Sequence, residues 1–384
     1  MTTSDVTQSS GRQLFGRART ALFSVLAAAA IVLTGCTNTS TTTGGGGGSD
    51  RATDAAIRKI VNGRELKVGF APPILSEFYT QIEKAAFVKM KEYEDRFGVK
   101  WKWERQGALN DAHSGTETLG IVQGYIARNF NAVFVCSAAN AATMQELYRK
   151  GNGSGVHFYQ FNSTVELANP SQAEDPTGGL ATVSNIGYDN RWQSGYVIGK
   201  YIAKELKGKG SVIEILGPSG SDWTKLRQQG FKKAVAENPG LTIVAQADGG
   251  YVRDKGFTAA QDLLTKFPDA KAIWGENEDM ALGASQAIDA RGLKHWDGQS
   301  GIITIGADGL VSGMGAIKAG KLTATMDVNS VAIGTQMIET LFAHELLGQG
   351  VPQFVQVSTG LVDKTNVDWH LANIQNTLKS PGKY

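Results

Sequence analysis

Residues 212–274 read VIEILGPSGSDWTKLRQQGFKKAVAENPGLTIVAQADGGYVRDKGFTAAQDLLTKFPDAKAIW. Two short apolar runs in this stretch, 212–216 and 241–247, have the length and side chains of buried strands. The segments that follow them, 223–238 and 253–267, have the length and spacing of helices. Strands that alternate with helices predict a parallel sheet with helices on both faces.

The same alternation extends outward from this stretch in both directions. Further strands are predicted at 66–70, 99–104, 132–136, 157–161, 272–274, 302–306, 322–326 and 354–357. Further helices are predicted at 77–96, 111–128, 191–206, 280–290, 310–319 and 331–347, with one ending near Arg149. Since this series has too many strands for one such sheet, the predicted fold class is α/β with two doubly wound parallel-sheet domains.

The composition and charge are those of a globular protein without a nucleic-acid partner. The chain has 384 residues, 41% of them apolar and 19% charged, with a net charge of +2. Its first 35 residues carry Arg12, Arg17 and Arg19 against Asp5, which leaves 35 basic and 35 acidic residues in the remainder. A neutral body lacks the basic surface that binding to phosphates requires.

The N-terminus is typical of a bacterial lipoprotein. Basic residues precede an apolar run over 21–33, which suits a signal peptide and is short for a membrane span. Small residues then lead to Cys36, which would receive lipid after removal of residues 1–35. The alternative is an ordinary secretory signal with a chance cysteine. Residues 36–60 are predicted to be a lipid-anchored flexible tether, because their Thr, Ser and Gly run offers no large apolar side chain.

Motifs of enzymes and metal sites are absent from the sequence. The five histidines, at 113, 157, 295, 344 and 370, show no metal-ligand spacing, and each is interpreted as a surface or structural residue. Gly217–Ser221 lacks the last glycine of a nucleophile elbow. Cys136 ends an apolar strand and is interpreted as a small buried side chain. The sequence therefore predicts no catalytic activity, no metal and no cofactor.

Polar and aromatic residues gather where the predicted strands end. Carboxyl ends of parallel strands meet at one edge of a sheet, and ligands bind there. Polyhydroxy compounds need polar groups that both donate and accept, together with flat rings for their C–H faces. Asp222 and Asp279 are interpreted instead as helix caps. The residues that we expect to bind ligand are Ser76, Phe78, Tyr79, Ser137, Asn162, Trp223, Lys225, Arg227, Tyr251, Asn277, Asp308 and Asp327.

Three stretches of the sequence form a recognisable pattern: 230–239, 253–283 with its Asn277-Glu-Asp-Met-Ala-Leu-Gly283, and Ile305-Gly306-Ala307-Asp308-Gly309 followed by 316–322. On these stretches, residues 64–362 resemble the ribose-binding-like periplasmic proteins of sugar-type ATP-driven importers.

The resemblance implies sugar-binding roles for several of the residues above. Phe78 and Tyr79 match the aromatic pair of the first domain, and Tyr251 matches an aromatic residue of the second. Asn277 and Asp308 match the amide and carboxylate that hold ring hydroxyls. Lys225 falls where relatives have Arg, and whether it or Arg227 takes that role stays open at this stage. Asn162-Ser163 stands where pyranose binders show Asp-Arg, which favours a sugar alcohol or small polyol over an aldohexose.

The resemblance also implies three crossings between the domains, near 187, 328 and 358. The first lobe would then contain 61–187 and 329–358, and the second 188–328 and 359–384. The expected protein is a monomeric, extracytoplasmic lipoprotein that captures a neutral sugar or polyol by hinge closure and delivers it to a permease and ATPase.

Three rival interpretations differ from this expectation. A sensor that presents the ligand to a receptor would use the same fold. A transcriptional repressor would need an N-terminal helix-turn-helix, where this chain has a lipoprotein signal. A hydrolase would need the catalytic groups that the sequence lacks.

Overall fold

The computed structural model describes the chain from residue 47 to 384, except for 109–113, 137–140, 165–180, 189–190 and 220. Helix α1 (Gly47–Val61) precedes two six-stranded sheets, which define two lobes. The helix shows that the prediction of a flexible tether is wrong for 47–60. Arg96 on α2 pairs with Asp54, and Arg58 donates to the carbonyl of Asp95, so α1 is held against the first lobe.

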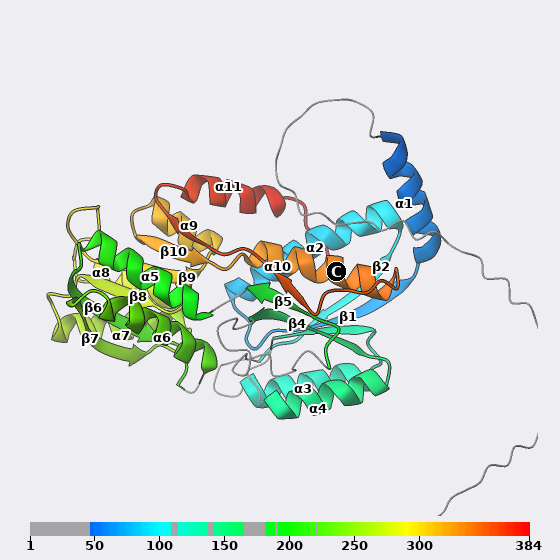
Figure 1. The fold of residues 1–384 in the computed structure, drawn as a ribbon, viewed down its shortest axis with the longest axis horizontal. Coiled ribbons are helices and arrows are strands. Elements are labelled where there is room, and N and C mark those ends of the chain that lie inside the picture. The colour runs from blue at the N-terminus through cyan, green and yellow to red at the C-terminus, as the bar shows by residue number, and fades with distance from the viewer. Residues whose placement is uncertain (1–46, 109–113, 137–140, 165–180, 189–190, 220) are drawn as a thin grey trace, which may run out of the picture. The chain divides into compact units, whose positions relative to one another are not determined.

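The first sheet has the strand order β2-β1-β3-β4-β5-β11, and all of its pairs are parallel. Its strands are β1 (Glu65–Ala71), β2 (Lys100–Arg105), β3 (Ala132–Val135), β4 (His157–Thr164), β5 (Ser184–Tyr188) and β11 (Phe354–Gln356). Helices α2 (Glu77–Phe97) and α10 (Ser330–Glu345) lie on one face, and α3 (Ser114–Ala127) and α4 (Ala141–Gly153) on the other (Figure 1).

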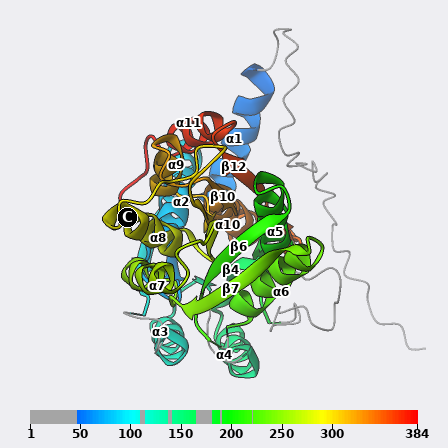
Figure 2. The same ribbon diagram turned by 90° about the vertical axis from the view of Figure 1, so that its left-hand side faces the viewer.

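The second sheet repeats the arrangement in the order β7-β6-β8-β9-β10-β12. Its strands are β6 (Lys209–Leu216), β7 (Gly240–Asp248), β8 (Ala272–Gly275), β9 (Ile303–Asp308), β10 (Ala324–Asp327) and β12 (Gly360–Asp363). Helices α5 (Arg191–Glu205) and α6 (Asp222–Ala236) lie on one face, and α7 (Arg253–Lys266) and α8 (Glu278–Ala290) on the other (Figure 2). Helices α9 (Val311–Lys318) and α11 (Val367–Thr377) complete this lobe.

The predicted fold class is confirmed: both lobes are doubly wound α/β units. The exception is β12, which is antiparallel to β10 at the edge of the second sheet. The chain crosses between the sheets after β5, after β10 and after β11. The sequence reasoning missed β5, β12, α1 and α11.

Each sheet is buried on both faces, because apolar side chains project from it in both directions. In the first lobe, Phe70, Phe134 and Phe161 belong to the core beneath α2 and α10, whereas Val133 and Phe158 pack toward α3 and α4. In the second lobe the corresponding cores lie beneath α5 and α6 and beneath α7 and α8. At about 1.5–3 kcal/mol per buried large side chain, these cores are the main source of stability.

The end of the chain departs from the predicted division into lobes, which assigns all of 359–384 to the second lobe. The backbone N–H of Gly382 donates to the carbonyl of Phe87, and the Tyr384 hydroxyl donates to Glu94, both on α2 of the first lobe. The last residues therefore contact the first lobe, after α11 has packed on the second.

Candidate ligand-binding site

A pocket lies between the two lobes at the carboxyl ends of their strands. The space among its side chains, counted out to its open mouth, is about 460 Å³. It is lined by residues of both lobes: Ile74, Ser76, Phe78, Tyr79, Asn162, Trp223, Arg227, Tyr251, Asn277, Asp279 and Asp308. Ligand sites of open α/β sheets lie at this edge.

The start of α2 supplies the aromatic side of the pocket. Ser76 is the N-cap residue, with extended backbone, and its carbonyl accepts bonds from the backbone N–H and the hydroxyl of Thr80. This turn places Phe78 and Tyr79 at the pocket, with their ring centroids 5.1 Å apart and nearly perpendicular. Both residues are more than nine-tenths buried, so packing against their neighbours holds the rings in place.

Behind these rings lies a small neutral polar cluster. The Tyr79 hydroxyl lies 3.6 Å from Cys136 Sγ, and Asn162 Nδ2 donates to the same sulfur at 4.0 Å. Burial, and then the neighbouring Cys136, raise the pKa of Tyr79 well above its ordinary value. Burial likewise raises the pKa of Cys136 to about 11, so its thiol stays protonated and is a poor nucleophile. The Asn162 Oδ1 is buried without a hydrogen-bond partner among the described residues.

Arg227, on α6, is the charged centre of the second lobe's side. It is 3% exposed, and it donates to the carbonyl of Glu276 and, at 3.5 Å, to the Tyr188 hydroxyl. Burial alone would lower the pKa of Arg227, but the neighbouring Tyr188, Tyr251, Asp308 and Glu276 raise it. The guanidinium is therefore held charged in a fixed orientation, which suits it to donate in pairs to adjacent oxygens.

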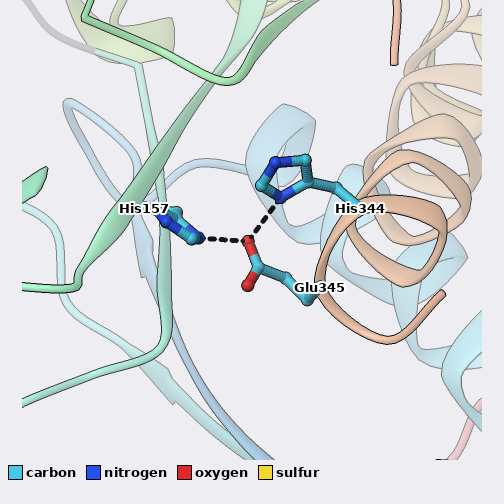
Figure 3. A group of neighbouring side chains, drawn as sticks. All are labelled: His157, His344 and Glu345. Carbon is cyan, nitrogen blue, oxygen red and sulfur yellow. Dashed lines mark hydrogen bonds and ion pairs between the residues drawn. The ribbon is translucent and has the colours of Figure 1, made fainter. Parts of the chain in front are cut away.

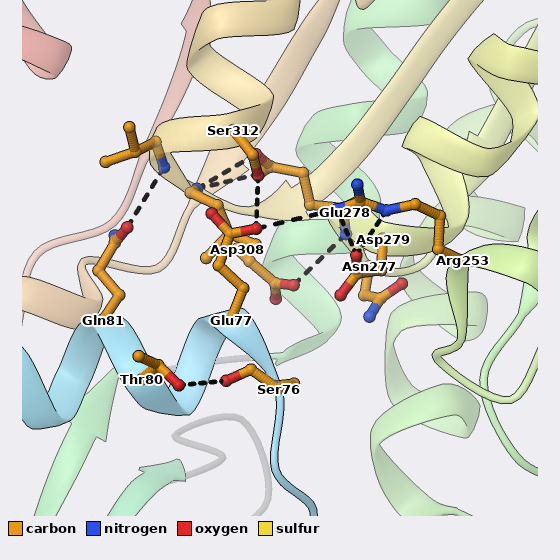
Figure 4. Close-up of polar contacts among 12 residues, drawn as sticks. Ser76, Glu77, Thr80, Gln81, Arg253, Asn277, Glu278, Asp279, Asp308 and Ser312 are labelled. Carbon is orange, nitrogen blue, oxygen red and sulfur yellow. Dashed lines mark hydrogen bonds and ion pairs between the residues drawn. The ribbon is translucent and has the colours of Figure 1, made fainter.

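Asp308 ends β9 near this arginine. It is 7% exposed and has φ of 149°, a strained backbone for a residue with a side chain. Burial raises the pKa of Asp308 to about 7, while Arg227 acts in the opposite direction. Its Oδ2 accepts from the backbone N–H of Glu278 at 3.4 Å (Figure 4). The other carboxylate oxygen has no bond within the described residues, so it is free to accept from a ligand.

The first turn of α8 brings Asn277 and Asp279 to the pocket. Asn277 is the N-cap residue: its Oδ1 accepts from the backbone N–H of Met280 at 2.9 Å, and its Nδ2 donates to the Tyr251 carbonyl at 3.3 Å. Asp279 is bound by Arg253 through two bonds of 2.9 and 2.6 Å. The interpretation of Asp222 and Asp279 as caps is therefore wrong, because Ser221 and Asn277 occupy those positions.

Polar contacts join the lobes beside the pocket (Figure 4). Gln81 on α2 donates to the Gly309 carbonyl and to Ser330 Oγ, and it accepts from the backbone N–H of Val311. Glu77 accepts a bond of 2.8 Å from Ser312 and lies 3.8 Å from Arg253. The turn 309–311 is held from its other side by Glu278, which accepts from the backbone N–H groups of Gly309 and Leu310.

The structure brings nine of the twelve predicted residues together around the pocket: Ser76, Phe78, Tyr79, Asn162, Trp223, Arg227, Tyr251, Asn277 and Asp308. Lys225 is exposed and does not line it, whereas Arg227 does. Asp327 is outside it too, since it accepts from the backbone N–H of Asn329 and pairs with His370. Ser137 lies outside the described residues.

Sequence reasoning missed two residues of the pocket. Ile74 precedes the aromatic pair but carries no polar signal, and Asp279 is interpreted from the sequence as a helix cap. The proximity of Asp279 to Asn277 in the sequence could have placed it, since both lie at the start of the same helix.

Nothing in the described pocket resembles a catalytic centre. Arg191 lies over the ring of Trp223, with its guanidinium carbon 4.5 Å from the ring centroid, and adds a second cation next to this pocket residue. No helix among the described residues is long and apolar enough to cross a membrane. The predicted signal peptide over 1–35 and the predicted lipidation site Cys36 lie outside those residues.

Comparisons with known proteins agree with this geometry. The profile of a periplasmic binding protein domain matches residues 68–349. The chain is 35% identical over 158 residues to the ribose import binding protein RbsB of Escherichia coli, an alignment that covers 41% of this chain and 51% of that protein. It is 28% identical to a D-ribose/D-allose-binding protein of Pseudomonas aeruginosa, over 66% of this chain and 74% of that one.

Among solved structures, an ABC transporter solute-binding protein from Mycobacterium smegmatis with bound glycerol is similar over 79% of this chain and 96% of that one. The TM-score is 0.64 and the identity 28%. The alignment with the ribose import binding protein spans about half of that relative's length.

Since the family profile covers most of the body, the chain belongs to the periplasmic binding protein domain family. Its fold is the type I arrangement of two α/β lobes, as the resemblance implied. The relatives reported above are binding proteins, which supports the prediction of a protein without catalytic activity.

Proposed function

We propose that the protein is an extracytoplasmic solute-binding lipoprotein of an ABC transporter. It captures a small neutral carbohydrate or sugar alcohol between its lobes by hinge closure and delivers it to a membrane permease driven by an ATPase. The observation that carries the proposal is the pocket itself, in which buried rings from one lobe face a buried arginine and carboxylate from the other. The names of its relatives agree with a sugar or related ligand.

The charges of the pocket favour a neutral ligand. Arg227 and Asp308 both belong to the second lobe's side, and Asp279 is already paired with Arg253. An anionic ligand would meet the Asp308 carboxylate, and a cationic one would meet the Arg227 guanidinium. A hydroxyl can donate to Asp308 and accept from Arg227, so it satisfies both groups without burying a net charge.

The first lobe's side favours a small polyol within this class. Asn162 and Ser163 occupy the position where the resemblance implies a charged Asp-Arg pair in pyranose binders. The Asn162 Oδ1 offers one buried acceptor in its place. An acyclic or small polyol needs fewer hydrogen-bonding partners at this position than an aldohexose ring does.

A ligand screen by thermal shift tests the proposal. Tetritols, pentitols, D-ribose, D-allose and a charged sugar acid are compared, and we expect a raised melting temperature with a neutral polyol or sugar only. A shift with the sugar acid alone, or with none of the compounds, would contradict the proposed ligand class.

Calorimetry with the best compound of the screen tests the residues. Phe78→Ala and Asp308→Ala should weaken binding strongly without unfolding the protein. Asn277→Asp tests the third residue at the start of α8. It keeps the oxygen that caps the helix and removes the Nδ2 donor, so it should also weaken binding without unfolding the protein. Undiminished affinity in all three variants would show that the ligand binds elsewhere.

Lipid anchoring at Cys36 is tested separately. The full chain, expressed in a bacterial host, should fractionate with membranes, and Cys36→Ser should release it or leave an uncleaved precursor. Membrane association unchanged by this substitution, without lipid on Cys36, would contradict the anchor.

A sensor that presents the same ligand to a receptor is the second candidate. Uptake of labelled polyol that depends on this protein and on a neighbouring permease would support transport, and a signalling response without uptake would support the sensor.

A further inference from the structure

A cluster of four polar side chains lies at the opposite edge of the first sheet from the pocket. His157 begins β4, while His344 and Glu345 end α10 (Figure 3). Tyr159 follows His157 on the same strand. The carboxyl end of β4 supplies Asn162 to the pocket. Asn162 stands five positions after His157 along the strand, a rise of about 16 Å, so the cluster is remote from the pocket.

Donors and acceptors of this cluster converge on one oxygen. Glu345 Oε1 lies 2.8 Å from His157 Nδ1, 3.0 Å from His344 Nδ1 and 2.7 Å from the Tyr159 hydroxyl. The ligand atoms of the two histidines and the glutamate all lie within 4.8 Å of one another. The Glu345 side chain is 9% exposed, whereas His157 and His344 are 39% and 28% exposed, so the cluster is open to solvent on one side.

We propose that His157, His344 and Glu345 bind a zinc ion. Two imidazole nitrogens and one carboxylate oxygen are a donor set that Zn²⁺ accepts in proteins, with a water in the remaining position. A tetrahedral ion with bonds of about 2.0–2.2 Å separates its ligand atoms by roughly 3.3 Å. The contacts of 2.8 and 3.0 Å need only a small expansion to reach this spacing. The two imidazole nitrogens, which lie within 4.8 Å of one another, would reach it by side-chain rotation.

The surroundings suit a cation. The site lies at the carboxyl end of α10, where the helix dipole places partial negative charge. The Tyr159 hydroxyl donates to Glu345 and can hold the carboxylate toward the ion, as partners outside the ligand set do in zinc sites. The ion would join the start of β4 to the end of α10, two segments almost 190 residues apart in the sequence.

Zinc binding is tested on the purified protein made without a polyhistidine tag and stripped of metal with a chelator. Titration with ZnCl₂ in a calorimeter should give one ion per chain, and zinc should raise the melting temperature by several degrees. His157→Gln and His344→Gln should each lower the zinc affinity by about tenfold or more, and Tyr159→Phe by about tenfold. Magnesium and calcium should produce no shift, since they prefer all-oxygen sites.

His295→Gln is the matched control. His295 also pairs with a carboxylate, Asp289 at 2.9 Å, but among the described residues this pair belongs to no group of three metal-ligating side chains. The change should therefore leave zinc binding intact. Melting curves without zinc establish that each variant folds. The chelated and zinc-loaded wild-type protein should respond equally to the polyol of the screen, which separates this test from that of the proposed function.

Two results would overturn the proposal. The first is a melting temperature of the wild-type protein that does not change with zinc, which would make the cluster a hydrogen-bonded clamp between β4 and α10. The second is zinc binding that persists undiminished in His157→Gln and His344→Gln, which would place the ion elsewhere.

Discussion

The two sides of the pocket are built from different chemistry. The first lobe contributes rings and neutral groups: Phe78 and Tyr79 pack on each other, and Asn162 shares a sulfur with Tyr79. The second lobe contributes Arg227 and Asp308, which are both buried and ionisable. An apolar surface recognises the C–H face of a ligand with little directionality, whereas charged groups fix the positions of hydroxyls. The comparison indicates that the first lobe supplies contact area and the second supplies stereochemical selection.

The difference extends below the surface of the pocket. Glu214, Glu276 and Glu278 are also buried in the second lobe. Burial is the main cause that raises their pKa values, to about 7, 8 and 8 respectively. Glu276 accepts from the backbone N–H of Gly217, and Glu278 accepts from the turn at Gly309 and from Thr325. Glu276 and Glu278 thereby hold the loops that carry the pocket's polar residues.

The largest expected effect is the loss of Arg227. Arg227→Met keeps the bulk of the side chain but removes the charge near Asp308, so the affinity for the best compound of the screen should fall by about 100-fold or more, that is about 3–5 kcal/mol. On the other side of the pocket, Phe78→Leu should lower the affinity only about tenfold, because part of the apolar surface remains. Calorimetry measures both, and a larger loss for Phe78→Leu would reverse the proposed division of labour.

A glycine-to-alanine change between α2 and α10 of the first lobe, or between α5 and α6 of the second, should lower the stability by a similar amount. The two changes should differ in their effect on ligand binding. An added Cβ on Gly334 would lie 2.1 Å from the Ile82 carbonyl oxygen, between α10 and α2. One on Gly195 would lie 1.9 Å from the carbonyl oxygen of Arg227, between α5 and α6. Each change to alanine should cost about 3 kcal/mol in urea unfolding. Only Gly195→Ala should also weaken binding, because it displaces the backbone of Arg227.

A glycine with open space is the control for this pair. Gly315 lies in α9, and nothing lies within 4 Å of an added Cβ. Gly315→Ala should therefore be neutral or stabilise the protein by up to about 1 kcal/mol. Equal ligand affinity in the Gly195→Ala and Gly334→Ala variants would contradict the argument that the position of α6 determines the affinity.

The buried carboxyl groups predict that the second lobe is more stable in mild acid. The folded-state pKa of Glu214, about 7, is above its ordinary value of 4.5. The folded state therefore binds the proton of Glu214 more tightly than the unfolded chain does. The resulting contribution to the stability of the fold is fully present below about pH 4.5 and is lost as the pH rises through 7. Glu214→Gln should therefore stabilise the protein by about 1–3 kcal/mol near pH 8 and leave it unchanged near pH 4.

Urea unfolding of wild type and variant at the two pH values measures this difference. Glu65→Gln is a control from the edge of the first sheet, where the exposed pair with Lys102 should contribute less than about 1 kcal/mol at either pH. A Glu214→Gln variant that is less stable near pH 8 would show that the carboxylate is needed in its charged form.

The smallest expected effect is at Lys225. The side chain is exposed and stands two residues before Arg227 on α6, so the two lie on different faces of the helix. Lys225→Ala should change the affinity by less than about 0.5 kcal/mol in the same calorimetric titration. A loss comparable to that of Arg227→Met would mean that Lys225 reaches the ligand after closure.

The sequence is sufficient to predict the fold and most of the pocket. Strand and helix periods are local, and polar residues that follow parallel strands meet at one edge of their sheet. Arg227 and Asp308 could therefore be expected together at the second sheet, with Asn162 at the matching edge of the first. The short strands β5 and β12 have little periodicity of their own and are fixed by pairing with distant strands. Helix α1 was missed because part of its sequence is rich in Gly and Ser, while its pairs with α2 are tertiary.

The histidine cluster shows the limit of such reasoning most clearly. His157 and His344 have no spacing that indicates a common site, and the sequence supports only separate structural roles for them. Their proximity follows from the packing of α10 on the first sheet, which joins the end of a helix to the start of a strand. Only the three-dimensional arrangement brings them to one carboxylate.

Gln81 carries a consequence for the rate at which a ligand leaves. Its amide spans the two lobes with bonds to Gly309, Val311 and Ser330, none of which belongs to the pocket's lining. If the lobes part as proposed, the bonds to Gly309 and Val311 break whatever molecule is bound. The residence time of every ligand would then share one component set by the protein, and a Gln81 variant would shorten all residence times by a similar factor.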